Sequence, residues 1–182
     1  MSILPTPRGA LCAALAAGCV LATPTIARAD CADADLYPAP DNLDRVRSAV
    51  VCLHNEERAE RGLRSLRADT RLRRAAAGHS DEMVEESYFA HDSADGSDFV
   101  DRILAARYVA RNDGYSLGEN LAWGTGNLST ARGVVDAWMR SSAHRANLLK
   151  KAYRDIGVGI RLGVPQDAGV GATYTIDFGV RS

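Results

Sequence analysis

The spacing of apolar side chains predicts a helical first half and a strand-rich end for the chain beyond residue 42. Apolar residues recur at intervals of three and four within 43–53 and again within 72–83, which is the pattern of two amphipathic helices. Asn42 and Asp69 precede these helices and are expected to cap them. Gly62 is expected to end the first helix.

The later part of the chain has the pattern of strands. Residues 155–162 and 172–180 alternate apolar and polar side chains, which predicts two half-buried strands. Because these two segments follow one another, we expect them to pair in an antiparallel manner. Residues 117–123 form an earlier and more apolar strand. The side chains expected to face inward on the last two strands are Ile156, Val158, Ile160, Tyr174, Ile176 and Phe178.

Shorter helices are expected between these segments. One begins at Ser97 or Asp98, another is capped by Ser129 and ends near Ser141, and a further turn of helix follows over 142–149. Helices that flank one strand and a later strand pair predict the α+β class. We expect a three-layer α-β-α sandwich, in which helices cover both faces of a small, mainly antiparallel sheet.

The N-terminus has the features of a secretory signal peptide. Arg8 gives a weakly positive start, and residues 9–22 form an apolar run that is too short to span a bilayer. The segment Ala27-Arg28-Ala29 has the A-x-A form of a cleavage site, so we expect cleavage between Ala29 and Asp30. Export to the secreted, extracytoplasmic space follows from this interpretation.

This leader divides the chain into three parts. Residues 1–29 are the predicted signal peptide, 30–42 a proline-containing extended arm, and 43–182 one domain. A mature chain of this size suits a single core that buries about 70% of the unfolded surface. No segment after the leader is long and apolar enough to span a membrane. We expect a monomer.

The cysteines allow two interpretations of the N-terminal region. Ala16-Ala17-Gly18-Cys19 resembles a lipoprotein box with Cys19 as the lipidated residue, although the leucine usual three positions earlier is absent. Cys12 and Cys19 both lie within the predicted leader. In an exported chain the remaining two, Cys31 and Cys52, are expected to form a disulfide that stabilises the fold by about 3 kcal/mol.

Charge and motifs exclude several classes of function. The chain has 22 basic and 23 acidic side chains, so no basic excess supports binding to nucleic acid or to an anionic membrane. No H-E-x-x-H, Walker A, paired C-x-x-C or G-x-G-x-x-G pattern occurs. Gly114-Tyr115-Ser116-Leu117-Gly118 matches the G-x-S-x-G elbow of α/β-hydrolases. A turn precedes Ser116 and a strand follows, however, which favours a structural role.

Glu119 is the residue that most needs an explanation, because it lies in an apolar strand bounded by glycines. A buried carboxylate is unfavourable unless it is paired, hydrogen-bonded or bound to a metal. His91, in a loop that we expect Tyr88 and Phe89 to anchor, and His144 are the candidate partners. Two imidazoles and one carboxylate can hold a divalent ion, or form a polar cluster without one. The other two histidines, His54 and His79, are expected to be structural.

Six blocks of sequence, in order and spacing, resemble the CAP superfamily of cysteine-rich secretory proteins, antigen 5 and pathogenesis-related 1 proteins, and especially its bacterial SCP-domain branch. The resemblance implies an α-β-α sandwich with Glu119 on its central strand. It also implies a cavity of two histidines and two glutamates that binds zinc or another divalent ion. By motif, His91, Glu119 and His144 match three of these positions, and Ser141 stands in the fourth. The blocks lie within 53–63, 76–91, 118–122, 138–147, 156–159 and 174–179.

These observations favour a secreted binding module over an enzyme. Its polar cavity is expected to take up Zn²⁺ or another divalent cation, and its extracellular ligand is unknown. A metal-dependent peptidase is the first alternative, but Ser141 removes the carboxylate that could serve as general base. A lipid or sterol carrier is the second alternative, and a purely structural polar cluster is the third.

Overall fold

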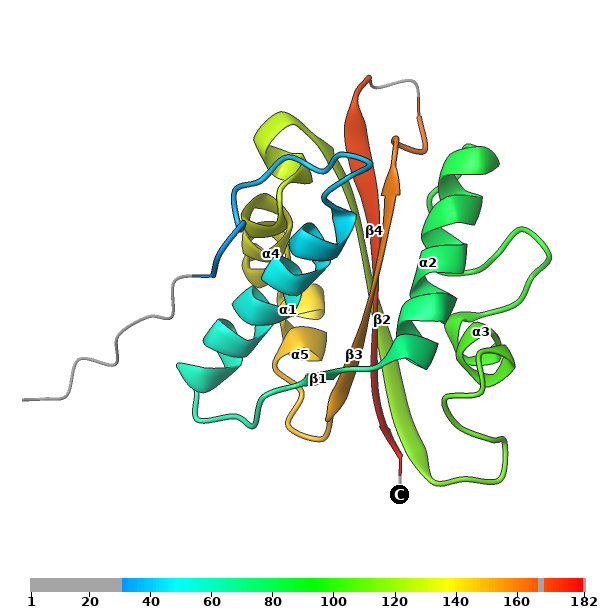
Figure 1. The fold of residues 1–182 in the computed structure, drawn as a ribbon. Coiled ribbons are helices and arrows are strands. Elements are labelled where there is room, and N and C mark those ends of the chain that lie inside the picture. Colours follow the sequence, from blue (N-terminus) through cyan, green and yellow to red (C-terminus); the bar gives the residue numbers. More distant parts are fainter. Residues whose placement is uncertain (1–30, 167–168, 182) are drawn as a thin grey trace, which may run out of the picture.

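A four-stranded sheet between two layers of helices makes up the computed structural model, which describes residues 31–166 and 169–181 (Figure 1). One face of the sheet is covered by α1 (Leu43–Ala59), α4 (Ala131–Arg140) and α5 (Ser142–Leu148). The other face is covered by α2 (Thr70–Glu85) and α3 (Phe99–Ala105). The predicted α+β class and three-layer sandwich are confirmed. The predicted signal peptide, its cleavage site and the alternative lipidation site lie outside the described residues.

The strands of the sheet stand in the order β1-β3-β4-β2. They are β1 (Arg67–Ala68), β2 (Tyr115–Thr125), β3 (Asp155–Leu162) and β4 (Gly171–Arg181). β4 pairs antiparallel with both β3 and β2, which confirms the predicted strand pair, whereas the unpredicted β1 runs parallel to β3. The expectation that the strand of Glu119 is central was wrong. Instead, β4 is an interior strand, and it is buried along residues 172–179 because strands flank it on both sides and helices cover both faces of the sheet (Figure 1).

Helix caps follow the prediction at two of four positions. The carboxylates of Asp69 and Asp98 accept hydrogen bonds from the first-turn amides of α2 and α3. Asn42 precedes α1 but makes no capping bond, because its side chain bonds to the backbone of the arm. Ser129 lies in the 3₁₀ turn η1 (Gly126–Ser129), and Thr130 caps α4 instead. The Ser129 hydroxyl donates to the carbonyl of Gly126 within that turn.

The arm before α1 is fixed at two points. Cys31 and Cys52 form the predicted disulfide, with a Cα–Cα distance of 5.7 Å. Further along, the carbonyl of Ala34 accepts from the amide of Arg132 on α4, and Asp35 pairs with the Arg132 side chain. The arm therefore lies against α1 and α4. Within the described part of the chain, no helix is both long enough and apolar enough to cross a bilayer.

The outer edge of β2 is covered by side chains rather than by another strand. Three alternate backbone carbonyls along this edge accept hydrogen bonds from side chains of the helical layer and the segment after it. The pairs are the Tyr153 hydroxyl with Leu117 (2.8 Å), the Asn147 amide with Glu119 (3.0 Å) and the Trp138 indole with Leu121 (2.9 Å). These contacts fix the position of α4 and α5 relative to the strand that carries Glu119.

Candidate functional site

Glu119 lies on β2 with only 1% of its side chain exposed, and both of its carboxylate oxygens have partners. Oε1 lies 2.7 Å from Nδ1 of His91, and Oε2 accepts a hydrogen bond of 2.8 Å from the guanidinium of Arg102. The structure therefore brings His91 and Glu119 into contact, as the sequence predicted. The hydrogen bond to Glu119 raises the pKa of His91 above its ordinary value, because the carboxylate stabilises the imidazolium.

Arg102, on α3, is the cation that sequence reasoning missed. Besides Glu119, its guanidinium donates to the carbonyl of His91 (2.8 Å), the hydroxyl of Ser93 (3.1 Å) and the carbonyl of Ser97 (3.3 Å). It thus ties the loop that carries His91 to the buried carboxylate. Phe89 is 41% exposed, so the expectation that it anchors this loop was wrong, since charged hydrogen bonds perform that task.

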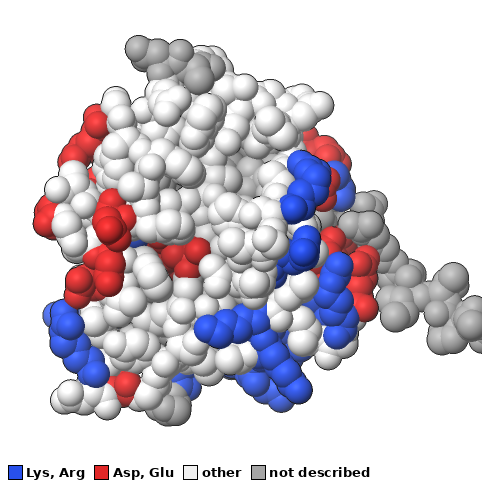
Figure 2. All heavy atoms as spheres, turned by 180° about the vertical axis from the view of Figure 1, so that it is seen from behind, with Lys and Arg blue, Asp and Glu red and all other residues white. Residues whose placement is uncertain are grey.

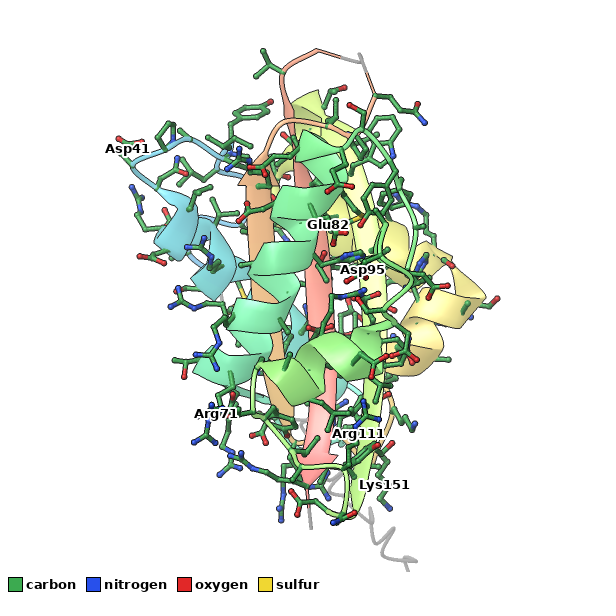
Figure 3. The ribbon with its side chains drawn as sticks, turned by 90° about the vertical axis from the view of Figure 1, so that its right-hand side faces the viewer. Asp41, Arg71, Glu82, Asp95, Arg111 and Lys151 are labelled. Carbon is green, nitrogen blue, oxygen red and sulfur yellow. A yellow bond between two sulfur atoms is a disulfide. The ribbon has the colours of Figure 1, made fainter. Side chains whose placement is uncertain are left out.

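A second attachment fixes the same loop to α2. The carboxylate of Glu82 accepts hydrogen bonds from the Ser93 hydroxyl (2.8 Å) and the Ala94 amide (3.0 Å). Figure 3 shows Glu82 on α2, with Asp95 on the loop that passes beside the helix. The position of His91 is therefore set by two charged side chains from two helices.

Asp177 on β4 is the second residue that the sequence analysis missed. It stands directly opposite Glu119 in the β2–β4 pairing and is 1% exposed. Burial and the negative charge of Glu119 raise the pKa of Asp177 well above its usual value, although Arg102 opposes the shift. Its carboxyl group therefore favours the protonated form, which can donate a hydrogen bond to Glu119. Two facing carboxyl groups then carry one negative charge beside one guanidinium.

His144 approaches the cluster from α5. Its backbone carbonyl accepts a hydrogen bond of 3.0 Å from the Asn120 side chain, and Asn147 bonds to Asn120 in turn. Burial, followed by the nearby charge of His91, lowers the pKa of His144. The two imidazoles therefore lie within electrostatic reach of each other. Ser141, the residue in the fourth position, lies at the junction of α4 and α5 and makes no helix-capping bond there.

The ligand atoms of His91, Glu119 and His144 do not all lie within 4.8 Å of one another. Among the histidine, cysteine, aspartate and glutamate side chains of the described residues, one group of three has ligand atoms that all lie within 4.8 Å of one another. This group is Cys31, Cys52 and Glu56. Glu119 holds Nδ1 of His91, which is how a carboxylate orients a histidine that ligates through its other nitrogen. If a divalent ion binds here, Nε2 of His91 and the imidazole of His144 would be its donors, with Glu119 as the carboxylate that orients His91.

His54, His79 and Ser116, which the sequence assigned to structural roles, lie in the core or within the sheet. His54 and His79 are fully buried, and their rings bond to the carbonyls of Val50 (2.8 Å) and Ala90 (2.9 Å). Ser116 lies within β2 itself, and in the described chain no strand leads directly into it as a nucleophile elbow requires. These three predictions are confirmed.

Charged side chains of both signs surround the face that carries the edge of β2. In Figure 2, acidic side chains are prominent on the left of this face and basic side chains at the lower right, with a basic group at the lower left and acidic groups at the right edge. The loop of His91 contributes the exposed residues Asp92 and Asp95, and the segment after α5 contributes Lys150 and Lys151.

The three-layer sandwich places the chain in the class of SCP-like domains. The sequence profile of the CAP family, described as the Cysteine-rich secretory protein family, matches residues 51–174. The chain belongs to this family.

Two curated bacterial proteins are similar to the chain in sequence. The chain is 36% identical over 121 residues to the uncharacterized protein YkwD of Bacillus subtilis (strain 168) and 32% identical over 111 residues to the uncharacterized membrane protein YlbC of the same organism. These matches cover 66% and 61% of this chain. They cover only 44% and 30% of the two relatives, so the chain spans less than half of their length.

Solved structures confirm the fold. An extracellular protein containing an SCP domain from Bacillus anthracis str. Ames superposes with a TM-score of 0.57 at 27% identity, covering 78% of this chain and 44% of that one. An outer surface protein from Borrelia burgdorferi gives a TM-score of 0.61 at 21% identity, covering 80% of this chain and 96% of that one. The second likeness shows the fold alone.

Proposed function

We propose that the chain is an extracellular binding module whose ligand is recognised by His91 and His144. One observation carries this proposal: the side chain of His91 is 55% exposed while a fully buried carboxylate holds its Nδ1. Nε2 makes no hydrogen bond to any described residue and is available to a ligand. The predicted leader, and the extracellular character of the similar Bacillus anthracis protein, support the location.

Binding is favoured over hydrolysis by the state of Glu119. A peptidase of this type needs a general base that removes a proton from water. One oxygen of Glu119 is held by the guanidinium of Arg102 and the other by His91, and only 1% of the side chain is exposed, so the carboxylate is poorly placed to receive a proton from an attacking water. The residue in the fourth position, Ser141, supplies no carboxylate in its place.

Zn²⁺ or another divalent cation is the first ligand to test. Two imidazoles leave the remaining coordination positions to water or to a donor group of a larger ligand. Glu119 keeps His91 in one orientation, and its loss is expected to weaken the affinity by about 10- to 100-fold. We propose that these residues bind and orient the ion, and we propose no reaction at the site.

Calorimetric titration of the metal-stripped, disulfide-bonded protein with Zn²⁺ tests this proposal. We expect one site, loss of the heat in His91→Ala and in His144→Ala, and an unchanged titration in the surface control Asp136→Asn, an exposed position on α4. If neither histidine variant alters the titration, the assignment of the site is wrong. Incubation with a peptide library covers the alternative, because chelator-sensitive cleavage would favour a peptidase.

A lipid carrier is the second candidate, because the structure has an apolar cavity that the sequence did not reveal. The cavity has a volume of about 280 Å³ and is lined by residues of α1, α2 and β3. The helices α1 and α2 lie on opposite faces of the sheet (Figure 1). Val51, Ile156 and Val158 line it, with Arg47 and Arg73 beside them. This composition suits the chain and head group of an amphipathic anion.

Displacement of a fluorescent fatty acid by palmitate tests this second function. Arg73→Ala is expected to weaken palmitate binding at least tenfold and to leave the binding of the uncharged alcohol of equal length unchanged. If palmitate fails to displace the probe from the wild-type protein, the carrier function is excluded. His91→Ala, a change beside β2 at the opposite edge of the sheet, is the matched control and should have no effect.

A further inference from the structure

A second cluster of metal-ligating side chains lies where the arm meets α1, apart from His91 and His144. The sulfur atoms of Cys31 and Cys52 and a carboxylate oxygen of Glu56 all lie within 4.8 Å of one another. Cys52 and Glu56 stand four residues apart on α1, so they share one face of the helix. Cys31 reaches the same face from the arm. Nothing in the proposed function uses this cluster.

The carboxylate of Glu56 lies beside the two sulfurs in a largely water-free environment. Glu56 is 8% exposed and Cys31 4% exposed. The sulfurs of a disulfide carry no hydrogen and cannot donate to a carboxylate. Two thiolates and a carboxylate, in contrast, form a donor set that suits Zn²⁺. The three groups can therefore bind one metal ion together only when the disulfide is reduced to two thiols.

We propose that the chain in its dithiol form binds Zn²⁺ through Cys31, Cys52 and Glu56, and that formation of the disulfide expels the ion. Three protein ligands leave the fourth tetrahedral position to water. The fold already holds the Cα atoms of the two cysteines 5.7 Å apart, so the sulfurs can reach one ion without movement of the backbone. The bound ion would hold the arm against α1 before the covalent bond exists.

The chemistry balances at each step. Binding releases the two thiol protons as Zn²⁺ takes up the two thiolates and the Glu56 carboxylate. Oxidation requires a disulfide oxidant, as in thiol–disulfide exchange. The two cysteine thiolates together lose two electrons and join as the S–S bond. The oxidant's disulfide takes up those electrons and leaves as two thiolates, and zinc departs unchanged as Zn²⁺. Glu56 then remains beside the closed disulfide.

The experiment uses the full mature chain with His91 and His144 both changed to alanine, so that the first site cannot contribute. This protein is reduced with a phosphine, checked for its fold by circular dichroism and titrated with Co²⁺ and then Zn²⁺. We expect one ion per chain, a thiolate-to-cobalt charge-transfer band, and displacement of Co²⁺ by Zn²⁺. The oxidised protein should show neither the band nor the binding.

Variants separate a built site from two adventitious thiols. Glu56→Gln should weaken Zn²⁺ binding at least tenfold and alter the cobalt spectrum, whereas the neighbouring change Glu57→Gln should leave both unchanged. The double change Cys31→Ser and Cys52→Ser should abolish binding. Equal affinity in the chains with Glu56 and with Glu56→Gln would overturn the proposal, as would absence of the charge-transfer band in reduced, folded protein. Because the histidines are already removed, either result leaves the proposed function standing.

Discussion

Replacement of Arg102 by methionine tests whether the guanidinium, rather than apolar packing, holds the candidate site together. The Arg102 side chain is 11% exposed and that of Glu119 1%, so the ion pair between them is largely desolvated. Methionine keeps much of the length of the side chain and removes the charge and four hydrogen bonds. A buried carboxylate that loses its cation destabilises a protein by about 3–5 kcal/mol.

For a domain of this size, that loss corresponds to a fall in Tm of roughly 6–20 °C. Thermal and urea unfolding followed by circular dichroism measure it. The double variant Arg102→Met/Glu119→Gln removes the stranded charge and should recover about half of the loss or more, since a neutral amide is less unfavourable to bury.

The matched control is Arg111→Met. Arg111 also belongs to an arginine–carboxylate pair, here with Asp101, but the two side chains are 75% and 45% exposed. An exposed pair of this kind contributes less than about 1 kcal/mol. If Arg102→Met proves no more destabilising than Arg111→Met, the electrostatic account of the site is refuted.

Three further measurements test other parts of the structure. Burial lowers the pKa of His54 to about 4, so the unfolded state binds the extra proton first as the pH falls below 6.5. The free energy of unfolding should drop by about 3 kcal/mol between pH 6.5 and 4, and His54→Gln should flatten this slope in urea titrations. Gly118→Ala would place a Cβ 2.1 Å from the Tyr153 hydroxyl and should lower the unfolding free energy by about 1–3 kcal/mol in urea. Asp177→Asn should be at least as stable as wild type at pH 7, because the raised pKa of Asp177 lowers the stability of the wild-type protein at any pH above the unfolded-state pKa. Below pH 3.8 the wild-type carboxyl group is protonated in both states, so the difference in unfolding free energy between variant and wild type should shift in favour of the wild type.

The sequence predicted those parts of the fold that have a periodic signal. The helices, the pair β3–β4 and the buried face of Tyr174, Ile176 and Phe178 all follow from spacing. The two-residue strand β1 is too short to show a period, and the insertion of β4 between β3 and β2 depends on contacts distant in sequence.

The candidate site was predictable in the same limited sense. A charge in an apolar strand identified Glu119, and the contact with His91 is present as expected. Arg102 resembled any solvent-facing residue of a short helix, and Asp177 resembled the outward member of an alternating strand. Their importance arises only where β2, β4 and α3 meet. The polar residue opposite a buried carboxylate in a neighbouring strand is the signal that could have found Asp177.

The side chains that cover the edge of β2 also bear on aggregation. An uncovered strand edge is a template on which a second chain can extend the sheet. On β2, three outward carbonyls are already occupied by Tyr153, Asn147 and Trp138, so an approaching strand finds no regular row of acceptors. Truncation of these side chains would therefore expose the edge of an 11-residue strand to edge-to-edge growth, whatever its effect on the stability of the single chain. We therefore expect solubility at high concentration to depend on these three hydrogen bonds, an effect that no binding assay would report.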